Sequence, residues 1–206
     1  MNAPLGVVLA GGLATRMGGG DKGLLRLGDR PLIGHVIDRL APECAALAIN
    51  ANGDPARWDI PDLRGLPVLP DSVADHAGPL AGVLAGLDWA ASLGADSIVT
   101  VAADTPFCPR DLVTRLRAQA GAQGLCLAAS PDATGRLQRH PTAGLWPTRL
   151  REDLRAALTG GLRKMVQWTD RHAGSVAAFD SQPVDPFFNV NTPQDLALAN
   201  RLSALA

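Results

Sequence analysis

Cysteines are few in this sequence, and their spacing fits neither a metal site nor a disulfide framework. Cys44, Cys108 and Cys126 are odd in number and widely separated, and none belongs to a Cys-x-x-Cys pair. Zinc knuckles need closely spaced ligand pairs and disulfide-rich domains need evenly numbered cysteines, so the sequence predicts neither. We expect three free thiols that pack as small apolar side chains in a reducing cytoplasm.

A large net charge and long apolar runs are also absent. The net charge of −1 gives no general attraction to nucleic acid or to an anionic membrane, so we expect contacts with neither. No apolar stretch is long enough to span a bilayer, and the apolar start lacks the basic residues of a signal peptide. We therefore expect a cytoplasmic protein in which a local charged site holds any polyanionic ligand.

Apolar residues, by contrast, are plentiful. They make up 47% of the 206 residues, against 19% that are charged, which excludes a disordered chain and suffices for one sizeable core. Short β-like runs alternate with amphipathic segments up to about residue 120. This order predicts an α/β fold with a mostly parallel central sheet and helices on both faces. The chain shows no linker or repeat, so we expect a single domain over residues 1–206.

Several expected elements have clear boundaries. Pro31 is typical of a helix start, and Thr192 with Asp195 is typical of the N-cap of a last helix. Residues 97–103 are almost continuously apolar, as expected of a strand that is covered on both faces. We expect strands at 6–9, 45–50, 66–69, 97–103, 125–129, 142–146 and 175–179, and helices at 31–40, 80–92, 110–119, 148–158, 162–171 and 193–202.

The segment from Leu9 to Lys22 directly follows the first strand and carries five glycines between residues 11 and 20. Glycines at this density let the backbone take positive φ and aim N–H groups at an anion. Arg16 and Lys22 add positive charge to the loop. Since α/β sheets bind ligands at the carboxyl ends of their strands, the segment predicts a site for a triphosphate.

Two commoner phosphate motifs do not fit this loop. A P-loop needs Gly-Lys-Ser/Thr, whereas Lys22 stands between Asp21 and Gly23. Gly18-x-Gly20-x-x-Gly23 has the letters of the dinucleotide fingerprint, but it begins nine residues after the strand instead of in a tight turn. The loop is therefore interpreted as a nucleotide site of a different kind.

Asp104 follows the apolar strand at 97–103, and Pro106 prevents that strand from continuing. By itself, an Asp-x-Pro after a strand is more often a turn or a helix cap. A carboxylate that faces the phosphate loop, however, suits a hard cation such as Mg²⁺, with phosphates and waters as further ligands. We predict that Asp104 binds the metal and acts in catalysis with Arg16 and Lys22. A non-catalytic nucleotide-binding regulator would have no use for this carboxylate.

The loop reads L-A-G-G-x-x-x-R-M-G-x-x-D-K and resembles the signature loop of the molybdenum cofactor guanylyltransferases, part of a larger family with the sugar-1-phosphate nucleotidyltransferases. The resemblance extends to about Leu196 and implies a Rossmann-like three-layer nucleotidyltransferase fold. In that fold we expect residues 1–123 to bind the nucleotide and residues 124–206 the second substrate. The residues implied to meet the base and ribose are Leu9, Ala10, Gly11 and Gly12, and those implied to meet the phosphates are Arg16 and Lys22.

Further motifs place other residues by the same resemblance. Asn50 at a strand end and Asp71 in Pro-Asp-Ser match positions near the nucleotide, as does G-P-L-A-G at 78–82. Asp104 matches the metal position of the family's D-x-P motif. The resemblance therefore implies that Asn50, Asp71 and Asp104 line one nucleotide site.

The second substrate is expected to contact the carboxyl-terminal part of the chain. F-N-V-N-T-P at 188–193 resembles a family motif there, and alternation in a short strand would place Asn189 and Asn191 on the same face. The segment around His140 resembles another family segment on the pterin side. We therefore predict Asn189, Asn191 and His140 as contacts of the pterin substrate.

The resemblance implies the transfer of GMP from GTP to molybdopterin-bound molybdenum, with release of pyrophosphate. The implied cofactor is Mg²⁺, with Mn²⁺ as its substitute, and GTP is the co-substrate. Transient contacts with molybdenum-insertion enzymes and with molybdoenzyme chaperones are implied as well. The alternatives are a CTP-dependent molybdopterin cytidylyltransferase and a sugar-1-phosphate nucleotidyltransferase.

Overall fold

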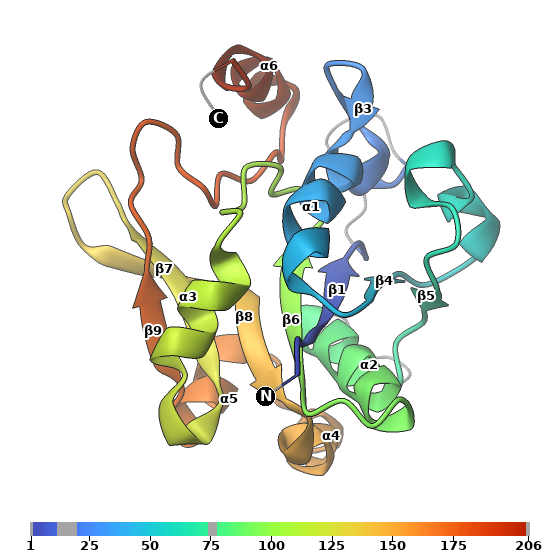
Figure 1. Cartoon of the computed structure of the whole chain (residues 1–206), viewed down its shortest axis with the longest axis vertical. Coiled ribbons are helices and arrows are strands. Elements are labelled where there is room, and N and C mark those ends of the chain that lie inside the picture. Colours follow the sequence, from blue (N-terminus) through green and yellow to red (C-terminus); the bar gives the residue numbers. More distant parts are fainter. Residues whose placement is uncertain (1, 12–19, 74–77, 205–206) are drawn as a thin grey trace.

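A seven-stranded sheet forms the centre of the molecule, and helices cover both of its faces (Figure 1). The computed structural model describes residues 2–11, 20–73 and 78–204. Gly12 and Arg16, two of the predicted loop contacts, lie outside the described residues. The three layers confirm the predicted α/β fold with a mostly parallel central sheet.

The strand order is β5-β4-β1-β6-β8-β7-β9. The first four strands of this order pair in parallel, β8 runs antiparallel to β6 and β7, and β9 pairs in parallel with β7. The carboxyl ends of all the strands except β8 therefore lie at one edge of the sheet. The strands are β1 (Leu5–Leu9), β4 (Leu47–Asn50), β5 (Val68–Leu69), β6 (Ser97–Ala102), β7 (Cys126–Pro131), β8 (Leu137–Pro147) and β9 (Ser175–Ala178).

Strand β8 is longer than the sequence indicates. The expected strand at 142–146 is only the end of an eleven-residue strand that begins at Leu137 and forms a hairpin with β7. Residues 137–139 of this strand are exposed, so they lack the apolar alternation that reveals a half-buried strand. The hairpin therefore extends the sheet where the sequence pattern is weakest.

Alternation along the strands divides the core into two layers. Val8 of β1 packs in one cluster with Ile33 and Leu112, whereas its neighbour Val7 packs in the other with Leu154. Accordingly, α1 and α3 cover one face of the sheet, and α2, α4 and α5 cover the other (Figure 1). The helices are α1 (Leu32–Leu40), α2 (Pro79–Ser92), α3 (Leu112–Gln119), α4 (Arg151–Thr159), α5 (Met165–Arg171) and α6 (Pro193–Leu202).

Helix α6 packs apart from these layers, on a small hairpin that the sequence did not reveal. Strands β2 (Arg26–Leu27) and β3 (Arg30–Pro31) have two residues each, too few to show a periodic pattern. Leu27 and Ala199 belong to a third apolar cluster, and the Gly28 N–H donates to Asn200 Oδ1 at 3.0 Å. The last helix thereby closes over the segment that follows Lys22.

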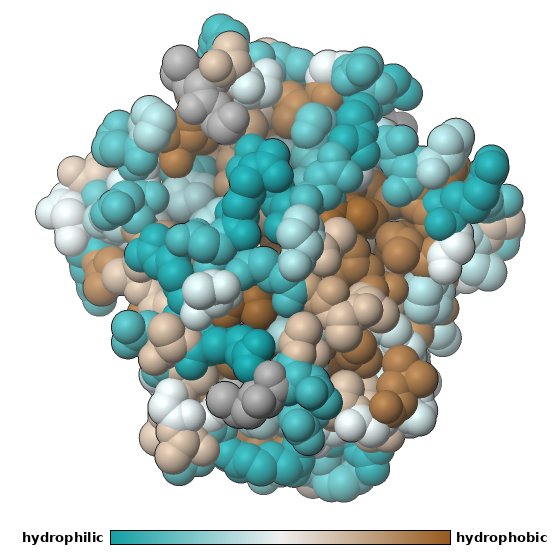
Figure 2. All heavy atoms as spheres, in the orientation of Figure 1, coloured by the Kyte–Doolittle hydropathy of each residue, from teal (hydrophilic) through white to brown (hydrophobic). Residues whose placement is uncertain are grey.

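The viewed surface is mostly hydrophilic, with hydrophobic side chains gathered mainly in the right-hand half of Figure 2. Within the described ranges, no helix is long and apolar enough to cross a membrane. The cytoplasmic location stays a prediction. Cys44, Cys108 and Cys126 are free, and burial raises the pKa of the Cys44 and Cys108 thiols to about 12, so both stay protonated at neutral pH.

Candidate active site

A cavity of about 450 Å³ opens at the sheet edge where β1, β4 and β6 end. Each of these strands contributes its last residues to the wall, and the start of α2 closes one side. Most of the predicted nucleotide contacts with described positions meet here. The lining residues are Leu9, Ala10, Gly11, Lys22, Gly23, Asn50, Asn52, Asp71, Gly78, Pro79, Ala102, Ala103, Asp104 and Thr142.

Lys22 and Asp104 form an ion pair in the cavity wall. Lys22 Nζ lies 3.1 Å from Asp104 Oδ2 and donates a second hydrogen bond, of 2.7 Å, to Asn191 Oδ1. The two charged side chains are only 18% and 15% exposed, so solvent screens their interaction weakly. The ammonium is thereby fixed between the strand end of β6 and the carboxyl-terminal segment.

The second oxygen of Asp104 takes no part in the ion pair with Lys22. Oδ1 is buried and has no hydrogen-bond partner among the residues that the structure describes. A buried carboxylate oxygen without a partner is costly, and a hard cation is a fitting ligand for it. No group of three or more His, Cys, Asp or Glu side chains in the described ranges could hold a metal. A cation here would therefore depend on Asp104 together with oxygens of a bound ligand.

The opposite wall of the cavity is a network of amides around Asp71. Its Oδ1 accepts from Asn50 Nδ2 at 3.0 Å, and its Oδ2 accepts from Asn52 Nδ2 at 2.8 Å. The Asp71 N–H in turn donates to Asn52 Oδ1 at 2.9 Å. Because both of its oxygens already accept hydrogen bonds, Asp71 is held in one orientation. Asn52 was missed at the sequence level.

Helix α2 approaches Asn50 so closely that only glycine fits at residue 82. A Cβ at Gly82 would lie 2.1 Å from Asn50 Oδ1 and 2.9 Å from Leu9 Cδ2. We expect Gly82→Ala to displace Asn50 and to lower the affinity for GTP, the predicted nucleotide, about 10-fold through the lost hydrogen bond. Overpacking should also lower the free energy of unfolding by about 1–3 kcal/mol. Isothermal titration calorimetry and thermal unfolding would measure the two effects.

Gly86→Ala is the matched control, because it lies one turn further along α2. A Cβ there would lie 2.8 Å from Ile98 Cδ1 and 2.8 Å from Val7 Cγ2, which are core atoms outside the cavity wall. We expect a similar loss of stability without a loss of GTP affinity. Equal affinities in the two variants would contradict the role assigned to Asn50.

The segment of Asn189 and Asn191 departs from the predicted short strand. No strand in the described part of the chain pairs with it, and its Val190 N–H instead donates to the Asp104 carbonyl in the turn after β6, at 2.9 Å. Alternation nevertheless holds, with Val190 buried and the two asparagines exposed. Asn189 Oδ1 accepts from Thr105 Oγ1 at 3.0 Å, and Asn191 reaches Lys22. Both amides therefore lie next to the turn that carries Asp104.

His140 does not line the cavity. Its Nε2 lies 2.8 Å from Ser130 Oγ, and its ring stacks on Phe187 with centroids 4.4 Å apart. Burial lowers the pKa of His140, with Asp185 acting in the opposite sense. The imidazole therefore favours its neutral form and belongs to a small network beside the site. Its contact with the second substrate stays a prediction.

Known protein sequences match this chain over most of its length. The model of the MobA-like NTP transferase domain matches residues 6–175. The chain is 53% identical to a molybdenum cofactor guanylyltransferase of Bradyrhizobium sp. (strain ORS 278), covering 97% of this chain and 93% of that one. It is 48% identical to one from Nitrobacter hamburgensis, with 97% and 94% covered.

Solved structures share the fold at low sequence identity. A molybdopterin-guanine dinucleotide biosynthesis protein A from Archaeoglobus fulgidus superposes with a TM-score of 0.72 at 21% identity, covering 98% of this chain and 100% of that one. A 2-C-methyl-D-erythritol 4-phosphate cytidylyltransferase from Thermus thermophilus gives 0.69 at 20% identity, with 99% and 100% covered. Together with the sequence matches, these likenesses show that the chain belongs to the MobA-like NTP transferase family and is a nucleotidyltransferase.

Proposed function

We propose that the chain transfers GMP from GTP to the molybdopterin form of the molybdenum cofactor, giving the guanine dinucleotide cofactor and pyrophosphate. The observation that carries the proposal is the cavity with Lys22 and Asp104 in one wall and the Asn50–Asp71 network in the other. This arrangement separates a charged end, suited to phosphates, from an amide-rich end, suited to a base and ribose. The names of relatives about 50% identical over nearly the full length support guanine and molybdopterin as the specific substrates.

In the proposed reaction, an oxygen of the pterin's terminal phosphate attacks the α-phosphorus of GTP. The new P–O bond forms as the bond from the α-phosphorus to pyrophosphate breaks, and pyrophosphate leaves with the bonding electrons. The nucleophile is already an anion, so the barrier lies in bringing like charges together and in stabilising the leaving group. Lys22 supplies positive charge for this purpose, and Arg16 is proposed to supply more. Leu9, Ala10, Gly11 and Gly12 are proposed to contact the base and ribose together with Asn50 and Asp71.

Asp104 is proposed to hold a divalent cation, Mg²⁺ or its substitute Mn²⁺. Its Oδ1 is buried and has no partner among the residues with described positions, which fits such an ion, and Asp104 lines the cavity in which the phosphates would lie. When bound, the cation would neutralise phosphate charge as the leaving group departs. The Lys22–Asp104 pair would keep the carboxylate turned toward a nucleotide in the cavity.

The second substrate is proposed to approach from the side of Asn189 and Asn191. Their contacts with Thr105 and Lys22 place this segment directly beside Asp104. His140 lies on β8 at the same edge of the sheet and is proposed as a further contact. In this view residues 1–123 bind the nucleotide and residues 124–206 the pterin, within one catalytic unit.

Pyrophosphate release with each of the four NTPs, with and without molybdopterin, tests the proposal. We expect release with GTP only, and only when molybdopterin is present. Release with CTP in place of GTP would indicate a cytidylyltransferase, and release with a sugar-1-phosphate as acceptor would indicate the other alternative. Binding of GTP without any release under these conditions would also overturn the proposal.

A further inference from the structure

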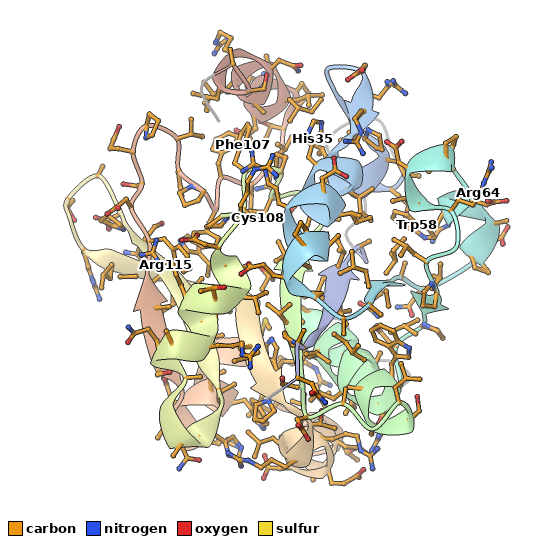
Figure 3. The ribbon with its side chains drawn as sticks, in the orientation of Figure 1. His35, Trp58, Arg64, Phe107, Cys108 and Arg115 are labelled. Carbon is orange, nitrogen blue, oxygen red and sulfur yellow. The ribbon has the colours of Figure 1, made fainter. Side chains whose placement is uncertain are left out.

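The connection between β4 and β5 contains a short helix that lies behind the cavity. This 3₁₀ helix, η4 (Pro55–Trp58), begins after Asp54, whose Oδ1 accepts from the Ala56 N–H at 2.9 Å. It carries Arg57 and Trp58, neither of which lines the cavity. Figure 3 shows Trp58 within this segment, with Arg64 further along the same connection. Arg57 and Trp58 both lie beside the segment around Lys22.

Arg57 reaches the residue that directly precedes Lys22. Its Nη1 lies 3.1 Å from Asp21 Oδ2, and the Asp21 side chain is only 8% exposed. Arg57 itself is 36% exposed, so its guanidinium bridges from the surface to a buried carboxylate. The orientation of Asp21, and with it the start of the Lys22 turn, is thus fixed by an ion pair from another part of the chain.

The same guanidinium also holds the opposite wall of the cavity. Its Nη2 donates to the Asn52 carbonyl at 2.5 Å, and its Nε donates to the Asp54 carbonyl at 3.1 Å. Asn52 is the residue whose side chain orients Asp71. One side chain therefore links the charged wall, through Asp21, to the amide wall, through Asn52.

Trp58 is buried close to the same turn. It is 2% exposed, and a Cβ at Gly23 would lie 3.7 Å from Trp58 Cζ3 and 2.9 Å from Ala103 Cβ. Gly23 thus lies between the indole and the residue before Asp104. With Asp21 paired to Arg57 and Gly23 close to Trp58, the residues on both sides of Lys22 lie beside one helical turn.

We propose that Arg57 is a positioning residue for the nucleotide, which sets the distance between Lys22 and the Asn50–Asp71 network without touching the ligand. The inference rests on the proposed function, because it assumes that this cavity holds a nucleoside triphosphate. Arginine suits the role, since its planar fork donates in several fixed directions at once, whereas a lysine ammonium acts as a single point charge.

Binding measurements with GTP and guanosine test the proposal separately from turnover. We expect Arg57→Met to weaken GTP binding about 10- to 100-fold, the range seen when a supporting partner of a ligand-binding side chain is removed at metal sites. Guanosine has no phosphates to meet Lys22 and would contact only the amide wall, which Arg57 holds indirectly through Asn52. Its affinity should therefore fall by a smaller factor than that of GTP, below the tenfold step of about 1.4 kcal/mol. The GTP affinity of Arg57→Lys should lie between those of the wild type and Arg57→Met, because lysine keeps the charge opposite Asp21 but lacks the planar fork of arginine.

Asp21→Asn provides an independent variant that leaves Arg57 in place. We expect a smaller loss of GTP affinity than in Arg57→Met, and a double variant no weaker than Arg57→Met alone, as for residues that act through one contact. Arg64→Met is the matched control, because Arg64 is exposed and does not line the cavity. It should bind GTP and guanosine as the wild type does.

The outcomes distinguish failure of this inference from failure of the proposed function. Equal losses for GTP and guanosine in Arg57→Met would indicate a merely structural role and overturn the inference. Wild-type GTP binding in both Arg57→Met and Asp21→Asn would overturn it as well. If the wild type itself bound GTP no more tightly than guanosine, the proposed function would fail first.

Discussion

Replacing Lys22 by alanine is expected to lower GTP-dependent turnover about 10²–10³-fold, as removal of a preorganised charge contact does in other transfer reactions. Lys22 is the charged donor placed between Asp104 and Asn191 in the cavity wall. Without its ammonium, the phosphates of GTP and the incoming anionic phosphate repel each other more strongly. Steady-state pyrophosphate release gives the rate, and circular dichroism shows whether the fold persists.

Lys164→Ala is the natural control, because Lys22 and Lys164 are the two lysines of the chain. Lys164 is exposed before α5 and does not line the cavity. It should turn over at the wild-type rate. Near-normal turnover in Lys22→Ala would contradict the role assigned to this residue. The proposed mechanism, which relies on its ammonium, would then be wrong.

Replacing Asp104 by asparagine is expected to lower turnover by a comparable factor, about 10²–10³-fold, and to raise the Mg²⁺ concentration needed for half-maximal rate. The amide keeps the size of the side chain but removes the charge that a hard cation seeks. It also leaves Lys22 without its anionic partner, so the effect comes from the lost charge and not from a change in packing. Rates over a Mg²⁺ series would measure both effects.

Asp111→Asn serves as the comparison, since Asp111 is an exposed carboxylate just before α3. Its Mg²⁺ dependence should match that of the wild type. If Asp104→Asn kept the wild-type Mg²⁺ dependence while its rate fell, the metal role would be wrong and the carboxylate would act only by holding Lys22. If both the rate and its Mg²⁺ dependence were unchanged, Asp104 would have no role in the reaction.

Strands β1, β4 and β6 were predictable because they are buried on both faces. Residues 97–103 are an example, since their continuous apolar run needs no neighbour to be recognised as a strand. The hairpin of β7 and β8 was only partly predictable, since the residues from Leu137 onward are exposed and polar. The two-residue strands β2 and β3 have no periodic signal at all.

The site was predictable as a set of strand ends, and less so as a set of contacts. Asn50 ends β4 and Asp104 lies in the turn after β6, and both are at the predicted edge because parallel strands share their carboxyl side. The hydrogen bond from Lys22 to Asn191 joins residues 169 positions apart, a separation at which local patterns carry no information. Arg57 was missed for the same reason, since nothing in the sequence indicates that a surface arginine on a short helix meets Asp21.

The strand order itself accounts for the position of the cavity. From β1 the chain crosses to β4 by way of α1, on one face of the sheet, and from β5 it crosses to β6 by way of α2, on the other. The connections on either side of β1 therefore diverge in opposite directions, which makes its carboxyl end a topological switch point and opens a crevice there. Because the crevice arises from the winding of the chain, the connecting segments can change their ligand contacts while the sheet stays as it is.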